Sequence, residues 1–169
     1  NHEDINVNEV NIDDNKITKK LSALHLAIEN EQIEIIKMLL NSENIDTNLI
    51  EYESISSFDH YEKTPLIIAI FKENIQIVQL LLSKKETNPN IIYHYYVYVV
   101  EFDGWNHDET NEKLTPLQLA IIKENKQIIQ ILLNSKKIDI NDIGYQYIVH
   151  DKLNKTALHI AVEKNNFDI

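Results

Sequence analysis

The spacing of apolar residues along the chain predicts short amphipathic helices arranged in pairs. Between residues 64 and 82 the apolar positions recur three and four apart on both sides of a polar break at residues 72–74, which indicates two helices joined by a turn. Thr64 suits the N-cap of the first helix, and Pro65 suits its first position, where a missing N–H costs nothing. Helices this short are marginal in water on their own, so each must bury its apolar face against another part of the protein.

This pattern occurs four times. Aligned on the cap residue, the copies begin at Ser22, Thr64, Thr115 and Thr156, and they read SALHLAIENEQIEIIKMLL, TPLIIAIFKENIQIVQLLL, TPLQLAIIKENKQIIQILL and TALHIAVEKNNFDI. The hydroxyl, apolar and alanine positions keep the same order in all of them. An internal repeat of this kind predicts a row of helix pairs in which neighbours bury one another's apolar faces.

The four copies resemble the ankyrin repeat, whose signature is T-P-L-H-x-A followed by a second apolar helix. The resemblance covers about the whole chain. It implies a mainly α fold, an ankyrin-repeat solenoid of stacked antiparallel helix pairs with extended β-hairpin fingers. Residues 1–169 would form a single array: the finger of a truncated upstream repeat (1–21), a repeat (22–63), a repeat with the longest finger (64–114), a third repeat (115–155) and the start of a truncated repeat (156–169).

Both ends of the sequence read as interrupted repeats. Residues 5–8 have the spacing of the IDTN segment at residues 45–48, which elsewhere follows a second helix, and the last copy stops where its second helix should begin. We therefore expect a fragment of a longer array. The alternative is a natural protein that ends in degenerate terminal repeats.

The spacing of the copies departs from the family. The caps lie 42, 51 and 41 residues apart, against about 33 in the family. Because the helical segments align without gaps, the additional residues must follow the second helix, and elongated fingers are expected. The family's glycine between the two helices is also replaced, by Glu31, Glu73, Glu124 and Asn165. Glutamate adopts the left-handed backbone region less readily than glycine or asparagine, so we expect tight or strained turns there.

The second finger is the most unusual stretch. A β-branched and aromatic run at residues 91–100 precedes Asp103 and Gly104, and Asp-Gly between such flanks predicts a hairpin. Side chains alternate along a strand, so Tyr93 and Tyr95 would face one side and Tyr96 and Tyr98 the other. At least one of these aromatic faces must be covered, either by neighbouring fingers or by a partner.

The sequence contains no pattern that supports catalysis. His25 and Glu29, and again His159 and Glu163, lie four apart on first helices, but two ligands do not make a metal site. The resemblance implies that these histidines make a structural hydrogen bond to the adjacent turn. With two glycines and no cysteine, the chain has no phosphate-binding glycine loop and no thiolate site, and it lacks HExxH. We expect no enzymatic activity, cofactor or metal.

The charge of the chain favours some partners over others. The formal net charge is −11, and residues 1–62 carry 14 acidic residues and 4 lysines. An acidic field disfavours nucleic acid and anionic lipid and favours a basic protein surface, although solubility alone also accounts for it. No apolar run is long enough to span a membrane. We expect an intracellular protein of the cytoplasm that binds neither nucleic acid nor membrane.

The function implied by the resemblance is a non-catalytic protein–protein interaction module, which binds a protein partner through its concave face and elongated fingers. An architectural scaffold segment of a long repeat protein and a regulatory arm of a larger enzyme are the alternatives. Self-association through the aromatic finger is a further option. Phe71 and Ile122 are apolar at normally exposed positions, which indicates a partner or an overlying finger. The candidate contact residues are Phe58, Tyr61, Phe71, Lys72, Tyr93, Tyr95, Tyr96, Tyr98, Trp105, Ile122 and Lys123.

Overall fold

The structure, a computed structural model, describes residues 6–13, 19–54, 59–100, 107–148 and 151–164. Its helices are α1 (Ala23–Glu29), α2 (Ile33–Leu40), α3 (Pro65–Phe71), α4 (Ile75–Ser83), α5 (Pro116–Ile122), α6 (Lys126–Leu133) and α7 (Ala157–Glu163). Its strands are β1 (Val10–Asp13), β2 (Lys19–Ser22), β3 (Glu51–Ser54), β4 (His60–Lys63), β5 (Tyr93–Val100), β6 (His107–Leu114), β7 (Gly144–Ile148) and β8 (Asp151–Lys155).

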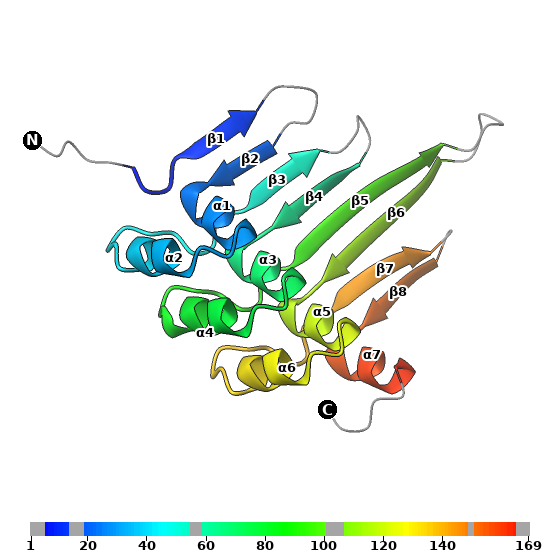
Figure 1. Cartoon of the computed structure of the whole chain (residues 1–169). Coiled ribbons are helices and arrows are strands. Elements are labelled where there is room, and N and C mark those ends of the chain that lie inside the picture. Colours follow the sequence, from blue (N-terminus) through cyan, green and yellow to red (C-terminus); the bar gives the residue numbers. More distant parts are fainter. Residues whose placement is uncertain (1–5, 14–18, 55–58, 101–106, 149–150, 165–169) are drawn as a thin grey trace, which may run out of the picture.

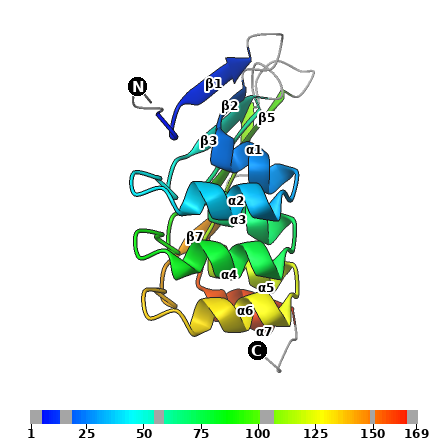
Figure 2. The same ribbon diagram turned by 60° about the vertical axis from the view of Figure 1, so that its left-hand side comes forward.

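The elements form two rows of helices and one sheet of hairpins. Inner helices α1, α3, α5 and α7 stack in one row, outer helices α2, α4 and α6 in a second, and the hairpins project from the inner row (Figures 1 and 2). All eight strands pair antiparallel in chain order. The predicted solenoid of helix pairs with hairpin fingers is therefore confirmed.

Local sequence explains where the inner helices begin. The Oγ1 atoms of Thr64 and Thr115 accept hydrogen bonds from the backbone N–H of Ile67 (3.3 Å) and Gln118 (3.2 Å). Each threonine therefore satisfies one of the free donors at a helix start, and the proline that follows it occupies a position that has no hydrogen bond to lose.

The core lies within the stack of helices and has no single centre. Leu24, Leu66 and Leu117 hold the same place in successive inner helices, and all three are buried. Helix α3 has neighbours on both sides, and its residues Pro65 to Ile70 are all buried. Apolar residues of the end helices are instead exposed, including Leu26 of α1 and Leu158 of α7. Burial here depends on having a neighbouring helix pair.

The additional residues of each copy form the fingers, as predicted. The β5–β6 hairpin is paired from Tyr93 with Leu114 out to Val100 with His107. Its neighbours reach only its base, because β4 pairs with residues 94–96 and β7 with residues 112 and 113. The second finger thus extends beyond those beside it (Figure 1). The predicted Asp-Gly turn at residues 103 and 104 lies outside the described residues.

The turns within the helix pairs have the predicted left-handed backbone. Glu31, Glu73 and Glu124 have φ angles of 52°, 55° and 57°, while Asn165 lies outside the described residues. Each glutamate also contacts the next copy along the row. Glu31 accepts a hydrogen bond from Asn74 (2.7 Å), and Glu73 and Glu124 bind Lys123 (3.3 Å) and Lys164 (3.2 Å). A glycine would relieve the backbone but lose these contacts.

Asparagines that follow the outer helices connect the copies through a ladder of hydrogen bonds. The Asn48 amide donates to the carbonyl of Glu86 and accepts from the N–H of Asn88, both at 2.8 Å. Asn8 binds residues 44 and 46 in the same way, and Asn90 binds residues 137 and 139. One side chain thus holds two backbone groups of the next loop, and this fixes the spacing of neighbouring copies.

Replacement of a ladder asparagine should weaken the whole array. Asn48→Ala removes two hydrogen bonds between copies, so we expect the free energy of unfolding to fall by about 1–3 kcal/mol. Urea denaturation followed by circular dichroism measures this change. The matched control is Asn141→Ala, because the Asn141 side chain is exposed and binds nothing among the described residues. A loss that is equal in both variants would contradict the role of the ladder.

Candidate functional site

A continuous groove runs between the inner helices and the bases of the fingers. It contains a hollow of about 690 Å³ beside α3 and α5 and another of about 290 Å³ beside α5 and α7. The two hollows share Glu112, Leu114 and Ile122 as lining residues. The groove therefore spans several copies of the repeat.

Strand register identifies the residues that hold equivalent places in this groove. The first residues of β3, β5 and β7 are Glu51, Tyr93 and Gly144, and each is paired with the residue just before a helix cap. On the helix side, Glu29, Phe71 and Ile122 are the last residues of α1, α3 and α5. Since these places differ in chemistry from copy to copy, they form an acidic, an aromatic and an open section, and Glu53 is the residue of the acidic section that lines one of the two hollows.

The acidic section surrounds one lysine with three carboxylates. Lys19 Nζ lies 2.8 Å from Glu29, 3.3 Å from Glu51 and 3.7 Å from Glu53. Glu51 is 1% exposed, and neither of its carboxylate oxygens has a hydrogen-bond partner among the described residues. Burial raises the pKa of Glu51, the charge of Glu29 raises it further, and Lys19 opposes both. Lys19 is thus the main counter-charge of a buried carboxylate.

The aromatic section is formed by α3 and two fingers. The rings of Tyr61 and Tyr95 are stacked with their centroids 4.6 Å apart. The rings of Phe71 and Tyr93 meet edge-on with their centroids 5.1 Å apart. Tyr93 is 4% exposed, and burial raises the pKa of its hydroxyl. Lys63 Nζ lies 4.6 Å from the centre of the Tyr61 ring, within the range of a cation–π interaction. This section has an apolar floor, and its lining also carries charges of both signs, with Lys63, Lys123, Glu53 and Glu112.

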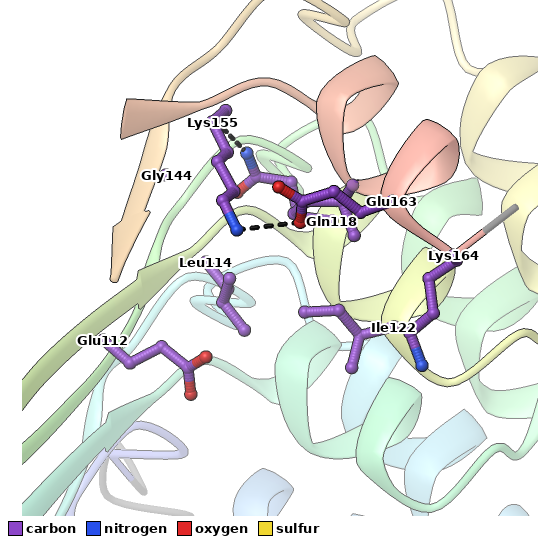
Figure 3. Close-up of a pocket in the computed structure, with 9 residues that line it drawn as sticks. Glu112, Leu114, Gln118, Ile122, Gly144, Lys155, Glu163 and Lys164 are labelled. Carbon is purple, nitrogen blue, oxygen red and sulfur yellow. Dashed lines mark hydrogen bonds and ion pairs between the residues drawn. The ribbon is translucent and has the colours of Figure 1, made fainter. Parts of the chain in front are cut away.

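The open section is the smaller hollow, beside Gly144 (Figure 3). A Cβ atom at this position would overlap Gln118 Oε1 and the carbonyl of Lys113, so only glycine allows β7 to pass this close. Gln118 is fixed at both ends, because it accepts from the N–H of Thr115 (2.9 Å) and donates to the carbonyl of Lys155 (2.5 Å). The rim carries the ion pair of Lys155 with Glu163 at 2.8 Å.

Most of the described candidate contact residues meet in this groove. The residues that line it are Tyr61, Phe71, Tyr93, Tyr95, Ile122 and Lys123. Lys72 is exposed but lines neither hollow, and Tyr96 stacks on His60 at 4.2 Å. Phe58 and Trp105, and the side chain of Tyr98, lie outside what the structure describes. Whether any of these residues contacts a partner stays a prediction.

Sequence reasoning missed the groove residues that act through strand pairing. Lys63, Leu114 and Lys155 directly precede the caps and line the hollows, so alignment of the copies one residue further upstream would have found them. The importance of Glu51 and Gly144 follows only from their shared place at the finger bases. That place depends on the register between strands.

The histidines have the structural role that the resemblance implied. His25 Nδ1 lies 2.8 Å from Ser22 Oγ, and its Nε2 lies 3.0 Å from the carbonyl of Leu49. Burial lowers the pKa of His25 to about 4. His159 contacts the hydroxyl of Thr156 at 2.7 Å in the same manner. Within the described ranges, no group of three or more acidic or histidine side chains is arranged to hold a metal ion.

A known protein family matches almost the whole chain. A family model described as "Ankyrin repeats (3 copies)" matches residues 2–93 and again residues 95–169. No curated protein matches the chain. In the described part of the chain, no helix has the length and apolar character needed to cross a membrane.

Removal of Lys19 should make the stability depend strongly on pH. A raised pKa means that folded Glu51 binds its proton more tightly than unfolded Glu51, so this group favours the folded state less as pH rises above about 4. We expect Lys19→Met to raise the pKa of Glu51 further and to lower the free energy of unfolding by about 1–3 kcal/mol at pH 7. The lost stability should be recovered towards pH 4.

Urea denaturation from pH 4 to pH 7 measures this effect. Glu51→Gln in the Lys19→Met background should restore stability at pH 7, and Lys20→Met is the matched control, since Lys20 is exposed. A pH dependence equal to that of the unmodified protein would contradict the assignment.

Proposed function

Because the chain belongs to the ankyrin-repeat family, whose repeats generally act as protein–protein interaction modules, we propose that it binds a protein partner in the groove between the inner helices and the fingers. The single observation that carries this proposal is the aromatic section of the groove. Tyr61, Tyr95 and Phe71 gather there, and all three keep part of their surface exposed. Aromatic residues in such hollows commonly dominate the energy of protein association.

The charges of the groove favour a partner surface that is mainly apolar with a few polar groups. Lys63 lies 3.6 Å from Glu53, Lys123 lies 3.3 Å from Glu73, and Lys155 is paired with Glu163. A partner surface that packs beside these ion pairs without separating them leaves no charge without its counter-charge. The acidic section, with three carboxylates for one lysine, is the place where a basic side chain of the partner would bind.

The proposed module is non-catalytic. Ankyrin-repeat domains typically lack catalytic activity. His25 and His159 contact the hydroxyls of their helix caps, His25 also contacts the adjacent finger, and its low pKa keeps His25 uncharged near neutral pH. No residue of the groove combines a nucleophile with a neighbouring base in the manner that covalent catalysis requires.

An architectural scaffold is the second candidate, and the burial of Tyr93 favours it. Tyr93 packs on Phe71 and lies beside Tyr61 of the preceding finger. These contacts join neighbouring fingers without any partner. The two functions can be distinguished at Phe71, because 36% of this residue remains exposed beside Tyr93. In recognition this exposed surface contacts the partner, whereas in a scaffold it has no partner to contact.

The experiment is selection of binders from a displayed library of random peptides against the purified protein. We expect Phe71→Ser to weaken the selected binders at least tenfold, since an aromatic anchor contributes more than about 1.4 kcal/mol. Met38→Ser is the matched control, because Met38 is a 71% exposed apolar residue on outer helix α2. Binding by fluorescence anisotropy and unfolding by urea are measured for each variant.

The outcomes separate the two candidates. Weaker binding with nearly unchanged stability supports recognition in the groove. Lower stability of Phe71→Ser with undiminished binding supports the scaffold, and equal effects of Phe71→Ser and Met38→Ser contradict binding in the groove.

A further inference from the structure

The open section of the groove lies beside the third-copy position that corresponds to Tyr93 in the second copy. Tyr93 and Gly144 are the first residues of β5 and β7, and they pair with Leu114 and Lys155 in the same register. Phe71 and Ile122 end the inner helices beside them. In the second copy the ring of Tyr93 packs edge-on against Phe71 at 5.1 Å. In the third copy Gly144 has no side chain, and a hollow of about 290 Å³ adjoins Ile122.

The apolar part of the lining of this hollow comes from three parts of the chain, and the rest of the lining is mainly polar or charged, with Glu112, Gln118, Lys155, Glu163 and Lys164. Leu114 comes from β6, Ile122 from α5 and Ile160 from α7. Figure 3 shows Leu114 and Ile122 on opposite sides of the space, with the charged groups of Lys155, Glu163 and Lys164 around its edge. We call this hollow the Gly144 socket.

The polar groups of the socket already have partners, and this includes the lining residue Glu112. Gln118 is bonded to Thr115 and to the carbonyl of Lys155, Lys155 is paired with Glu163, and Lys164 is paired with Glu124 at 3.2 Å. A charged occupant would have to break one of these pairs and would leave a group without its counter-charge. An uncharged apolar group can enter without that loss, and it gains the burial of its own surface.

We propose that the Gly144 socket receives the ring of a tyrosine from the protein segment that binds in the groove. The ring would take the place in the third copy that Tyr93 holds in the second, packed against Ile122 as Tyr93 packs against Phe71. Its hydroxyl would lie at the charged edge, where carboxylate and ammonium groups can bind it. An aromatic side chain gains a large buried area at little cost in conformational entropy. This inference rests on the proposed binding of a partner in the groove and names the residue type that anchors it.

The direct test uses p-cresol, which is the side chain of tyrosine, as the probe. We titrate it into the full chain and follow the isoleucine methyl groups by nuclear magnetic resonance, with the signals of Ile122 and Ile160 assigned from Ile→Val variants. The expected result is saturable ring-current shifts at both residues, with a dissociation constant on the order of 1 mM. Absence of shifts at these residues, or shifts of equal size over the whole protein, would overturn the proposal.

A blocking variant tests whether the occupied space is the socket itself. Ile122→Trp places an indole in the hollow, so p-cresol should no longer shift the Ile160 methyl group. Met38→Trp adds the same side chain to the outer face and should leave the shifts unchanged. If p-cresol still shifts Ile160 in Ile122→Trp, the ring binds elsewhere and the proposal is wrong.

A complementary variant opens the equivalent place in the second copy. Tyr93→Gly removes the internal ring, and p-cresol should then raise its thermal unfolding temperature more than it raises that of the unmodified protein. An equal effect on both proteins would count against the equivalence of the two places. If this variant does not fold, the titration of the unmodified chain still decides the proposal.

The socket and the proposed function can fail separately. Selected peptides that depend on Phe71 but lack a required tyrosine, and that bind Ile122→Trp normally, would overturn the socket and leave binding in the groove intact. Entry of p-cresol without any peptide that binds the groove would contradict the proposed function instead. Self-association that Ile122→Trp abolishes would show that a second copy fills the socket, and it would overturn the assignment to a partner segment.

Discussion

No helix of this protein can protect its own apolar face. The described helices are 7 to 9 residues long, shorter than a helix that is stable alone in water. Their stability must therefore come from neighbours, and the gradient of burial shows this directly. Ile68 in the middle of the row is buried, whereas Leu26, at the same place in α1, is exposed. The asparagine ladder and the bridging glutamates then fix the distance and orientation of copies that the apolar contacts bring together.

The framework of the fold could be predicted because it depends on local sequence. The caps at Thr64 and Thr115, the left-handed turns at the glutamates and the length of the fingers all follow from residues close in the chain. The groove depends on register between strands that are distant in sequence, so the burial of Glu51 and the hollow beside Gly144 could not be predicted in this way. The asparagines were visible as a repeated pattern, but their bonds to the next copy required the structure. The exact division of the chain into repeats stays a prediction.

The groove shows how one framework can support different surface chemistry. The leucines at Leu24, Leu66 and Leu117 and the alanines at Ala27, Ala69 and Ala120 are the same in three copies, and they pack the stack. The finger-base residues are Glu51, Tyr93 and Gly144, which differ in charge, size and hydrogen bonding. Substitution at this place changes what the groove can bind, while the contacts between helices are kept. The buried carboxylate of Glu51 is the costly member of the set, and its dependence on Lys19 shows that the surrounding charges must change with it.

The ladder also has a consequence for how the chain folds. Its hydrogen bonds, like those of the bridging glutamates, join residues 36 to 52 positions apart, which is about one step along the row. No such bond requires distant ends of the polypeptide to meet. The entropy lost on closing each loop is therefore set by the length of one repeat and does not grow with the number of repeats. Folding can then begin at any adjacent pair and spread outwards, and the rate of the first event is independent of total length.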